Sequence, residues 1–267
     1  MSTVEFVDGI DRAWLAQAFQ RSPVTHAYAM WDLQQTPDKV RFVSCRRGAE
    51  SIAYLLIWYG SSSGPVVHWV GSDAEATPLI ERLPPRPLMA VVPAELAPLV
   101  LARRGPALSE PLLTLHRPWS TEGPPHTAPL TRRLHRSDNE VLAAFVRHYP
   151  DPLAPSYASF DPAMEVAWGA FSPETGALEG VAKTSARLAT LWFITGVFVA
   201  PGARRRGLAT ALTAGLVRDA LRVHAASALY VREANLPARR AYEKVGFQFF
   251  GRRILVDAGV GQLASPP

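Results

Sequence analysis

The stretch Val197–Ala209, V-F-V-A-P-G-A-R-R-R-G-L-A, holds the residues that decide the fold. An apolar, β-forming run, Leu191–Val199, leads into Pro201 and Gly202, and three arginines, a glycine and a helix-forming run follow. This order predicts a strand, a tight basic loop and the start of a helix. Backbone N–H groups at a helix start point outward, and the helix dipole favours negative charge there. Because Gly207 has no Cβ, a ligand can approach the backbone closely. The stretch therefore predicts a binding site for a phosphate group.

Two familiar nucleotide-binding loops do not match this stretch. It lacks the G-x-x-x-x-G-K-[ST] pattern, so nucleotide hydrolysis is not supported. It also lacks G-x-G-x-x-G, so a dinucleotide fold is not supported. The remaining alternative is a charged helix start without a ligand. Three arginines there are unfavourable against the helix dipole unless an anion is bound, which favours the anion site.

Length and composition place the chain among globular proteins. Its 267 residues are enough for two domains, and 48% hydrophobic and 19% charged residues are typical of soluble proteins. No apolar run approaches the roughly 20 residues that span a bilayer, and the first residues lack a signal-peptide pattern. We therefore expect a cytoplasmic protein with no membrane partner. The single cysteine, Cys45, excludes an internal disulfide and a cysteine-rich metal site. We expect Cys45 to be a half-buried apolar thiol in a strand, and we expect no metal.

The charge pattern argues against nucleic acid as a partner. The net charge is +5, and 25 of the 28 basic residues are arginines. They are spread along the chain in twos and threes, which is typical of a solvated surface rather than a nucleic-acid footprint. We therefore expect no nucleic-acid binding.

A polar, proline-rich segment, Ser120–Pro129, predicts a linker between domains 1–122 and 126–267. In the first half, Asp11 is expected to cap a helix over Arg12–Phe19. The other expected helices of this half are Ala74–Leu83 and Ala94–Ala102, and its expected strands are Val40–Cys45, Ser51–Tyr59, Pro65–Val70, Leu88–Val92 and Leu112–His116.

After the linker the pattern of elements restarts. Ser172–Gly176 predicts a hairpin turn between two strands. The expected strands are Leu130–Leu134, Glu165–Phe171, Ala177–Arg187, Leu191–Val199, Ala228–Val231 and Phe247–Val256. The expected helices are Ser137–His148 (capped by Ser137), Arg206–His224 and Pro237–Val245. A loose tail is expected over Ala258–Pro267. The two α/β halves have a similar order of elements, which suggests a tandem fold. The nearest counterpart of the basic loop in the first half is Arg82–Pro87, where prolines remove backbone donors.

Two motifs in the second half occur together and in order. Arg204-Arg-Arg-Gly207-Leu-Ala209 resembles the Arg/Gln-x-x-Gly-x-Gly/Ala acetyl-CoA loop of the GNAT superfamily of acyl-CoA-dependent N-acetyltransferases. The segment L-Y-V-R-E-A-N, ending at Asn235 and followed by Ala238, Tyr242 and Gly246-Phe247, is similar to the second motif of that superfamily. The resemblance covers roughly residues 130–256. It implies an α/β (α+β) fold with a mixed, largely antiparallel sheet flanked by helices, a degenerate GNAT-like domain over 1–122 and a catalytic domain over 126–267.

The resemblance also implies a binding mode for acetyl-CoA. The pyrophosphate is expected on the backbone amides of Arg205–Thr210, and the pantetheine arm beside Val197–Val199. The sheet is expected to splay open between that strand and the strand carrying Tyr230. Asn235 is expected to hydrogen-bond the pantetheine or the loop, and Ala238 to leave room for the cofactor. The implied cofactor-binding residues are Val197, Phe198, Val199, Arg204, Arg205, Arg206, Gly207, Leu208, Ala209, Thr210, Asn235 and Ala238.

Tyr242 is the residue that we expect to be catalytic. The implied reaction is direct attack of a neutral amine on the thioester, which expels a thiolate. A phenol with a pKa of about 10 stays protonated at neutral pH and can give its proton to that thiolate. Cys45 belongs to the other half, so we expect a ternary complex and no acyl-enzyme. The alternative interpretation is a tyrosine packed in the core.

The base and the acceptor stay open. Many relatives carry a glutamate on the strand before the phosphate loop, but here Thr190 and Thr195 are its nearest polar residues. Gly196 is expected to mark a bulge at the splay, where backbone carbonyls hold the amine. The candidate bases are Glu165, Glu179, Glu233, His135 and the strand backbone with an ordered water; the carboxylates that suit a cationic acceptor, or are only solvated, are Asp151, Asp161 and Glu165.

Three functions remain in competition. The leading one is transfer of an acetyl group to a small primary amine or an amino acid. The others are acetylation of a protein N-terminus or lysine, and a non-catalytic acyl-CoA-binding module. The first half is expected to cover the acceptor side or to form a homodimer. Its aromatic residues Trp14, Trp31, Trp58, Tyr59 and Trp69 either pack in a core, which is favoured, or line an acceptor pocket.

Overall fold

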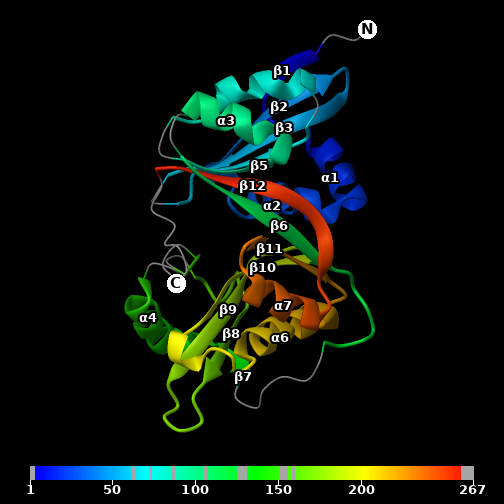
Figure 1. The fold of residues 1–267 in the computed structure, drawn as a ribbon. Helices are drawn as coiled ribbons and strands as arrows, with labels where there is room; N and C mark the ends of the chain where they lie inside the picture. The colour runs from blue at the N-terminus through cyan, green and yellow to red at the C-terminus, as the bar shows by residue number, and fades with distance from the viewer. Residues whose placement is uncertain are drawn as a thin grey trace. The chain divides into compact units, whose positions relative to one another are not determined.

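A computed structural model describes residues 4–61, 64–72, 74–85, 88–104, 107–124, 131–150, 156–157 and 160–259 (Figure 1). The expected linker from residue 125 on and the expected tail from residue 260 on lie outside the described residues. The chain divides into two compact units. Unit 1 holds Met1–Leu113 and Gly251–Ser265, and unit 2 holds Thr114–Phe250 and Pro266–Pro267.

This division differs from the one expected at residues 122–126. The chain leaves unit 1 inside β6 (Leu108–Arg117) and returns to it inside β12 (Gln248–Ala258). The reason is strand pairing: β12 pairs antiparallel with β5 (Leu88–Pro93), in a register that runs to Ala258 opposite Leu88. The proline-rich composition marks a connection along the chain, whereas the units follow backbone hydrogen bonds between distant segments.

Unit 1 is a sheet with helices on both faces. Its strand order is β1-β2-β3-β4-β5-β12-β6, and β4 and β5 form a parallel pair within it. The other elements of this unit are β1 (Val4–Asp8), α1 (Arg12–Arg21), α2 (Pro23–Gln35), η1 (Pro37–Lys39), β2 (Val40–Arg47), β3 (Glu50–Trp58), β4 (Val66–Val70), η2 (Ala74–Arg82), η3 (Ala94–Leu96) and α3 (Ala97–Arg104), where η marks a 3₁₀ helix.

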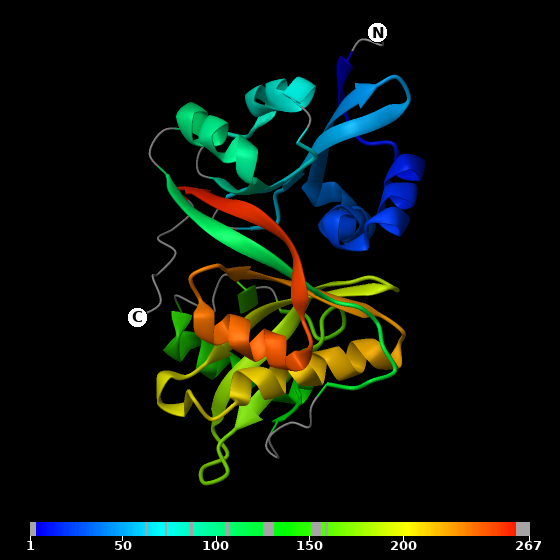
Figure 2. The ribbon, with the colours of Figure 1, turned by 45° about the vertical axis from the view of Figure 1, so that its right-hand side comes forward.

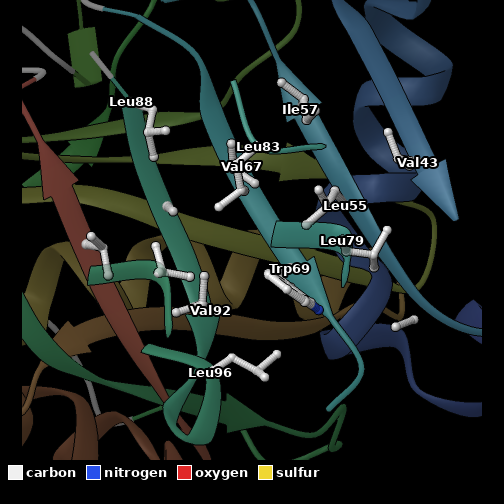
Figure 3. Close-up of a cluster of buried hydrophobic side chains, with 14 of the residues drawn as sticks. Val43, Leu55, Ile57, Val67, Trp69, Leu79, Leu83, Leu88, Val92 and Leu96 are labelled. Carbon is white, nitrogen blue, oxygen red and sulfur yellow. The ribbon is translucent and has the colours of Figure 1, made fainter. Parts of the chain in front are cut away.

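Both faces of the unit 1 sheet are buried. On β3, Leu55 and Ile57 point into the cluster of Figure 3, while Tyr54 and Leu56 belong to a second cluster with Leu15 of α1. Alternate residues of a strand point to opposite faces, so a strand covered on both faces is apolar throughout. The first cluster contains Val43, Leu55, Ile57, Val67, Trp69, Leu79, Leu83, Leu88, Val92 and Leu96 (Figure 3).

Several local expectations for the first half are tested by these elements. Asp11 caps α1, because its Oδ1 accepts from Ala13 N at 2.8 Å, as predicted. Cys45 lies in a strand as expected, but it is fully buried rather than half-buried. Trp69 is 1% exposed in the first cluster, which confirms core packing for that residue. Two elements of this unit, β1 and α2, were not predicted from the sequence.

Unit 2 is a mixed sheet with the order β6-β11-β10-β9-β8-β7, in which β10 and β11 are parallel. Helix α6 packs against β7 to β11 and lies beside α7, gold and orange in Figure 2, while Phe145 of α4 packs with Val181 of β9. The elements are β7 (Thr131–Arg133), η4 (Arg136–Asp138), α4 (Asn139–His148), β8 (Ala167–Phe171), β9 (Leu178–Arg187), β10 (Leu191–Val199), η5 (Pro201–Ala203), α6 (Leu208–Arg222), β11 (Ala226–Arg232) and α7 (Leu236–Val245).

The expected fold class is confirmed, since the strands of both units form largely antiparallel sheets flanked by helices. One predicted cap is wrong: Ser137 lies inside η4, and Asp138 is the N-cap residue of α4. In the hairpin, Gly176 N donates to Ser172 O at 2.9 Å, as expected. No helix among the described residues has the length and apolarity to cross a bilayer.

The two units share one local arrangement. In unit 1 the parallel strands β4 and β5 are joined through η2, as β10 and β11 are joined through α6 in unit 2. The structural counterpart of the basic loop is therefore the segment that starts at Gly71-Ser72, and not Arg82–Pro87 as expected from the sequence. Neither position places an arginine run at a helix start.

Candidate active site

Strand β10 separates from β11 halfway along its length. The parallel pairing runs from Leu191 opposite Ala226 to Ile194 opposite Leu229, and no pair is formed beyond it. On its other side β10 stays paired with β9 as far as Val199. From Thr195 onward, no described strand pairs with the β11-facing edge of β10, as predicted. Such an edge can hydrogen-bond an extended ligand as a further strand does.

A bulge lies where the two strands separate. The register between β10 and β9 shifts between Thr195 and Phe198, and Gly196 has a φ of +59°. A Cβ at Gly196 would lie 2.8 Å from Cε2 of Tyr157. Both the left-handed backbone and the close ring require glycine. The register shift confirms the predicted bulge.

The loop after β10 ends at an uncapped helix start. Gly207 is the N-cap residue of α6, with a φ of 78°, and it provides no side chain to cap the first turn. Among the described residues, none of the backbone N–H groups of Arg205–Thr210 donates a hydrogen bond. Arg205 itself has a φ of +64°, which is uncommon for a residue with a side chain. These N–H groups are free to bind an anion.

The three arginines of the loop have different surroundings. Arg206 Nη1 lies 2.9 Å from both carboxylate oxygens of Glu179 on β9. Arg204 Nε donates to the carbonyl of Val199 at 3.3 Å. Arg205 is exposed and forms no ion pair within the described part of the chain. Uncompensated positive charge in the loop therefore comes from Arg204 and Arg205, while Glu179 neutralises Arg206.

Asn235 begins α7 and fixes the second motif. Its Oδ1 accepts from Ala238 N at 3.2 Å, so the asparagine is the N-cap of the helix. Pro237 occupies a position in the first turn where no backbone donor is needed. The side-chain amide N–H₂ of Asn235 has no partner among the described residues. That amide can donate to a ligand while the oxygen caps the helix.

Tyr242 is buried in unit 2. It is 6% exposed, and its ring meets the ring of Phe247 edge-on at 6.1 Å between centroids. Burial raises the pKa of Tyr242 above its ordinary value, because the phenolate is poorly solvated there. Its hydroxyl has no hydrogen-bond partner among the described residues. The hydroxyl therefore keeps its proton at neutral pH and has one to donate.

The candidate bases are in four different environments. Glu165 forms an ion pair with Lys183, at 2.6 Å between Oε1 and Nζ. Glu179 is bonded to Arg206 in the phosphate loop. His135 is the N-cap residue of η4, and the backbone carbonyl of Glu233 accepts from Arg239. The partner of Glu165 lies beside the bulge, since Lys183 is directly opposite Thr195 in the sheet.

Two residues of this region did not emerge from the sequence. Tyr157 donates its hydroxyl proton to the carbonyl of Gly196 at 3.1 Å, and Lys183 is 4% exposed on β9. No local pattern marks Tyr157. Lys183 carried one available signal, since it is one of three lysines in the chain and lies in a largely apolar strand. No group of three or more metal-ligating side chains is present among the described residues.

Several solved structures have a fold similar to that of this chain. A Drosophila protein matches with a TM-score of 0.69 and 16% identity, covering 94% of this chain and 97% of its own. A GCN5-related N-acetyltransferase from Kribbella flavida matches at 0.59 and 20% identity, covering 88% and 96%. A tandem GNAT protein from the clavulanic acid biosynthesis pathway matches at 0.53 and 15% identity, covering 97% and 99%. No curated protein gave a significant match.

The model of the acetyltransferase (GNAT) family matches residues 109–247, just over half of the chain. The matched residues include the unpaired edge of β10, the uncapped start of α6 and Tyr242. The chain therefore belongs to the acetyltransferase (GNAT) family and is an acyltransferase enzyme.

Proposed function

We propose that unit 2 transfers the acetyl group of acetyl-CoA directly to the primary amine of a small molecule or an amino acid, with Tyr242 as general acid. The observation that carries this proposal is that unit 2 combines three features. The unpaired edge of β10 is followed by the uncapped N-terminus of α6, and the unpartnered hydroxyl of Tyr242 belongs to the same unit.

The phosphate end of acetyl-CoA fits the start of α6. A pyrophosphate accepts hydrogen bonds from backbone N–H groups, and those of Arg205–Thr210 have no partner in the described structure. Arg204 and Arg205 add positive charge, and no carboxylate of the described residues forms an ion pair with them. The pantetheine arm contains amides, so it suits the edge of Val197–Val199 that faces away from β9, where β11 no longer pairs.

Tyr242 acts on the leaving group. The lone pair of the neutral amine forms a bond to the thioester carbonyl carbon, and the C–S bond breaks with its electron pair on sulfur. The phenol then gives its proton to that sulfur. Burial raises the pKa of Tyr242, which keeps the acid protonated across the physiological range. With Cys45 buried in unit 1, no thiol of unit 2 offers an acyl-enzyme route.

The position of Tyr157 favours a small acceptor. Its hydroxyl bonds the carbonyl of Gly196 at the bulge, and its ring lies against the position that a Cβ of Gly196 would take. A tyrosine ring that covers the bulge in this way leaves less room for a peptide lying along the strand. We further propose that unit 1 is a degenerate copy of the same fold, since it repeats the parallel strand pair without a basic loop.

Release of CoA thiol from acetyl-CoA with a panel of small amines, amino acids and peptides tests the function. We expect Tyr242→Phe to lower kcat about 10²–10³-fold and to leave the Kd of acetyl-CoA within about twofold. Tyr59→Phe, at a half-exposed tyrosine of unit 1, is the matched control and should match the wild type. Tight binding of acetyl-CoA without thiol release by any amine identifies a binding module instead. Unchanged turnover of Tyr242→Phe removes its role as the acid.

A further inference from the structure

A buried ion pair lies next to the bulge of β10. Lys183 Nζ and Glu165 Oε1 are 2.6 Å apart, and their side chains are 5% and 14% exposed. Lys183 pairs with Thr195 in the β9–β10 ladder, so its side chain leaves the sheet one residue from Gly196. Directly opposite residues in an antiparallel pair point to the same face. The ion pair is therefore on the Thr195 face of the sheet, at the end of the β10–β11 pairing.

Aromatic rings and the bulge carbonyl complete this cluster. Lys183 Nζ lies 5.4 Å from the centroid of the Tyr157 ring and 5.9 Å from that of Phe160. The hydroxyl of the same Tyr157 donates to the carbonyl of Gly196. The carboxylate of Glu165 is thus linked through Lys183 and Tyr157 to the backbone at which β10 and β11 separate.

Stability alone gives little reason for such a pair. Taking two charges out of water costs several kcal/mol, and well-packed apolar residues often replace a buried ion pair without loss of stability. Glu165 also has acceptor capacity to spare. Oε1 accepts from Lys183, and Oε2 accepts from Asp161 N at 3.2 Å, whereas a carboxylate offers about four acceptor positions. The remaining positions can receive the N–H groups of an ammonium ion.

We propose that Glu165 is the base of the acetyl transfer and the residue that binds the acceptor ammonium, and that Lys183 is the positioning residue that holds its carboxylate. This inference rests on the proposed function. One proton of the ammonium passes to the carboxylate, which leaves a neutral amine. The amine forms the N–C bond as the C–S bond breaks, and sulfur takes the proton of Tyr242. The new amide nitrogen then loses a proton, which restores Tyr242 through solvent, and Glu165 releases its proton to solvent.

The surroundings of Glu165 suit a base. Burial raises the pKa of Glu165, while the charge and hydrogen bond of Lys183 act in the opposite direction. The other charged or titratable groups around it are Tyr157, Asp161 and Arg187, which donates to the carbonyl of Met164. A carboxylate with a raised pKa holds a proton more firmly than an exposed one, so it takes a proton from an ammonium more readily.

The pH dependence of kcat/KM in Glu165→Gln tests the proposal. The glutamine keeps the shape and an acceptor for Lys183 but cannot take a proton. We expect kcat/KM at neutral pH to fall at least 100-fold, with the Kd of acetyl-CoA unchanged within twofold. Because only amine that is already neutral then reacts, the rate should rise tenfold per pH unit up to the pKa of the amine, and a weakly basic amine should restore it. Glu174→Gln, on the exposed hairpin turn, is the control and should match the wild type.

Two further variants separate this role from a structural one. The double variant Lys183→Met/Glu165→Leu removes both charges and should fold with a similar thermal midpoint, yet be as slow as Glu165→Gln. Lys183→Met alone should move the acid limb of the kcat/KM profile to higher pH. Wild-type rates and pH profile in Glu165→Gln or in the double variant overturn the proposal. If the acid limb of the kcat/KM profile stays at the same pH in Lys183→Met, the positioning role of Lys183 is overturned. If the wild-type enzyme acetylates no amine, it is the proposed function that is wrong.

Discussion

Replacing Gly196 by alanine tests whether the bulge on β10 is built as described. The residue has a φ of +59°, and an added Cβ would lie 2.8 Å from Cε2 of Tyr157 and 3.3 Å from Cβ of Ser156. A left-handed backbone costs alanine about 1–2 kcal/mol, which a less flexible unfolded chain offsets by about 0.4–1 kcal/mol. Crowding in a packed site adds about 1–3 kcal/mol. We expect the free energy of unfolding to fall by about 2–4 kcal/mol.

Gly176→Ala is the matched control for the cost of placing alanine in a left-handed backbone conformation. Gly176 has a φ of +69° in the β8–β9 turn, and nothing lies within 4 Å of an added Cβ. It should therefore lose only about 1 kcal/mol, and urea unfolding of both variants measures the difference. We also expect kcat/KM to fall in Gly196→Ala alone, because the Gly196 carbonyl and Tyr157 must move apart. Equal stability and equal activity of the two variants would refute the account of the bulge.

Two more predictions concern the charged loop and the core of unit 1. Arg205→Ala should weaken acetyl-CoA binding about tenfold, in a salt-dependent way. Arg206→Ala should weaken it less, because Glu179 already neutralises Arg206. Isothermal titration at two salt concentrations measures both losses of affinity, and equal losses would contradict the different roles given to the two arginines. In unit 1, burial lowers the pKa of His26 to about 4 and that of His68 to about 3, with Arg253 adding to both shifts. Below pH 6.5 the unfolded chain binds protons that the folded unit does not, so its stability should fall as the pH falls from 6.5 toward 4. Hydrogen exchange of β3 amides, corrected for intrinsic rates, measures this loss, and constant protection over that range argues against it.

Much of unit 2 is readable from local sequence. The bounds of β10 agree with the predicted Leu191–Val199, and the loop and helix follow in the expected order. The expected bulge at Gly196 and the hairpin at Ser172–Gly176 also occur. These features depend on residues a few positions apart, through backbone dihedral preferences, turn residues and helix ends.

Helix α2 and the cap of α4 show where local patterns fail. The stretch P-V-T-H-A-Y-A-M-W-D-L-Q-Q mixes β-branched, aromatic and small residues, and its apolar side chains do not follow one helical face. It folds as a helix because it packs on the sheet of unit 1, where Tyr54 Oη and His26 Nδ1 are 2.8 Å apart. At α4, a 3₁₀ turn moved the cap from Ser137 to Asp138.

The sequence by itself determined the strand, the basic loop and the helix start that Val197–Ala209 encodes. Neighbouring residues suffice there, because dihedral preferences and caps act within a few positions. Tertiary structure alone decided that β12 pairs with β5, and that Glu165 meets Lys183 while Tyr157 meets Gly196. These partners are 18 and 39 residues apart, and a contact at that separation depends on how whole strands align. The loop therefore supports the proposed acetyl donor from sequence, whereas the residues of the proposed acceptor site meet only in the folded chain.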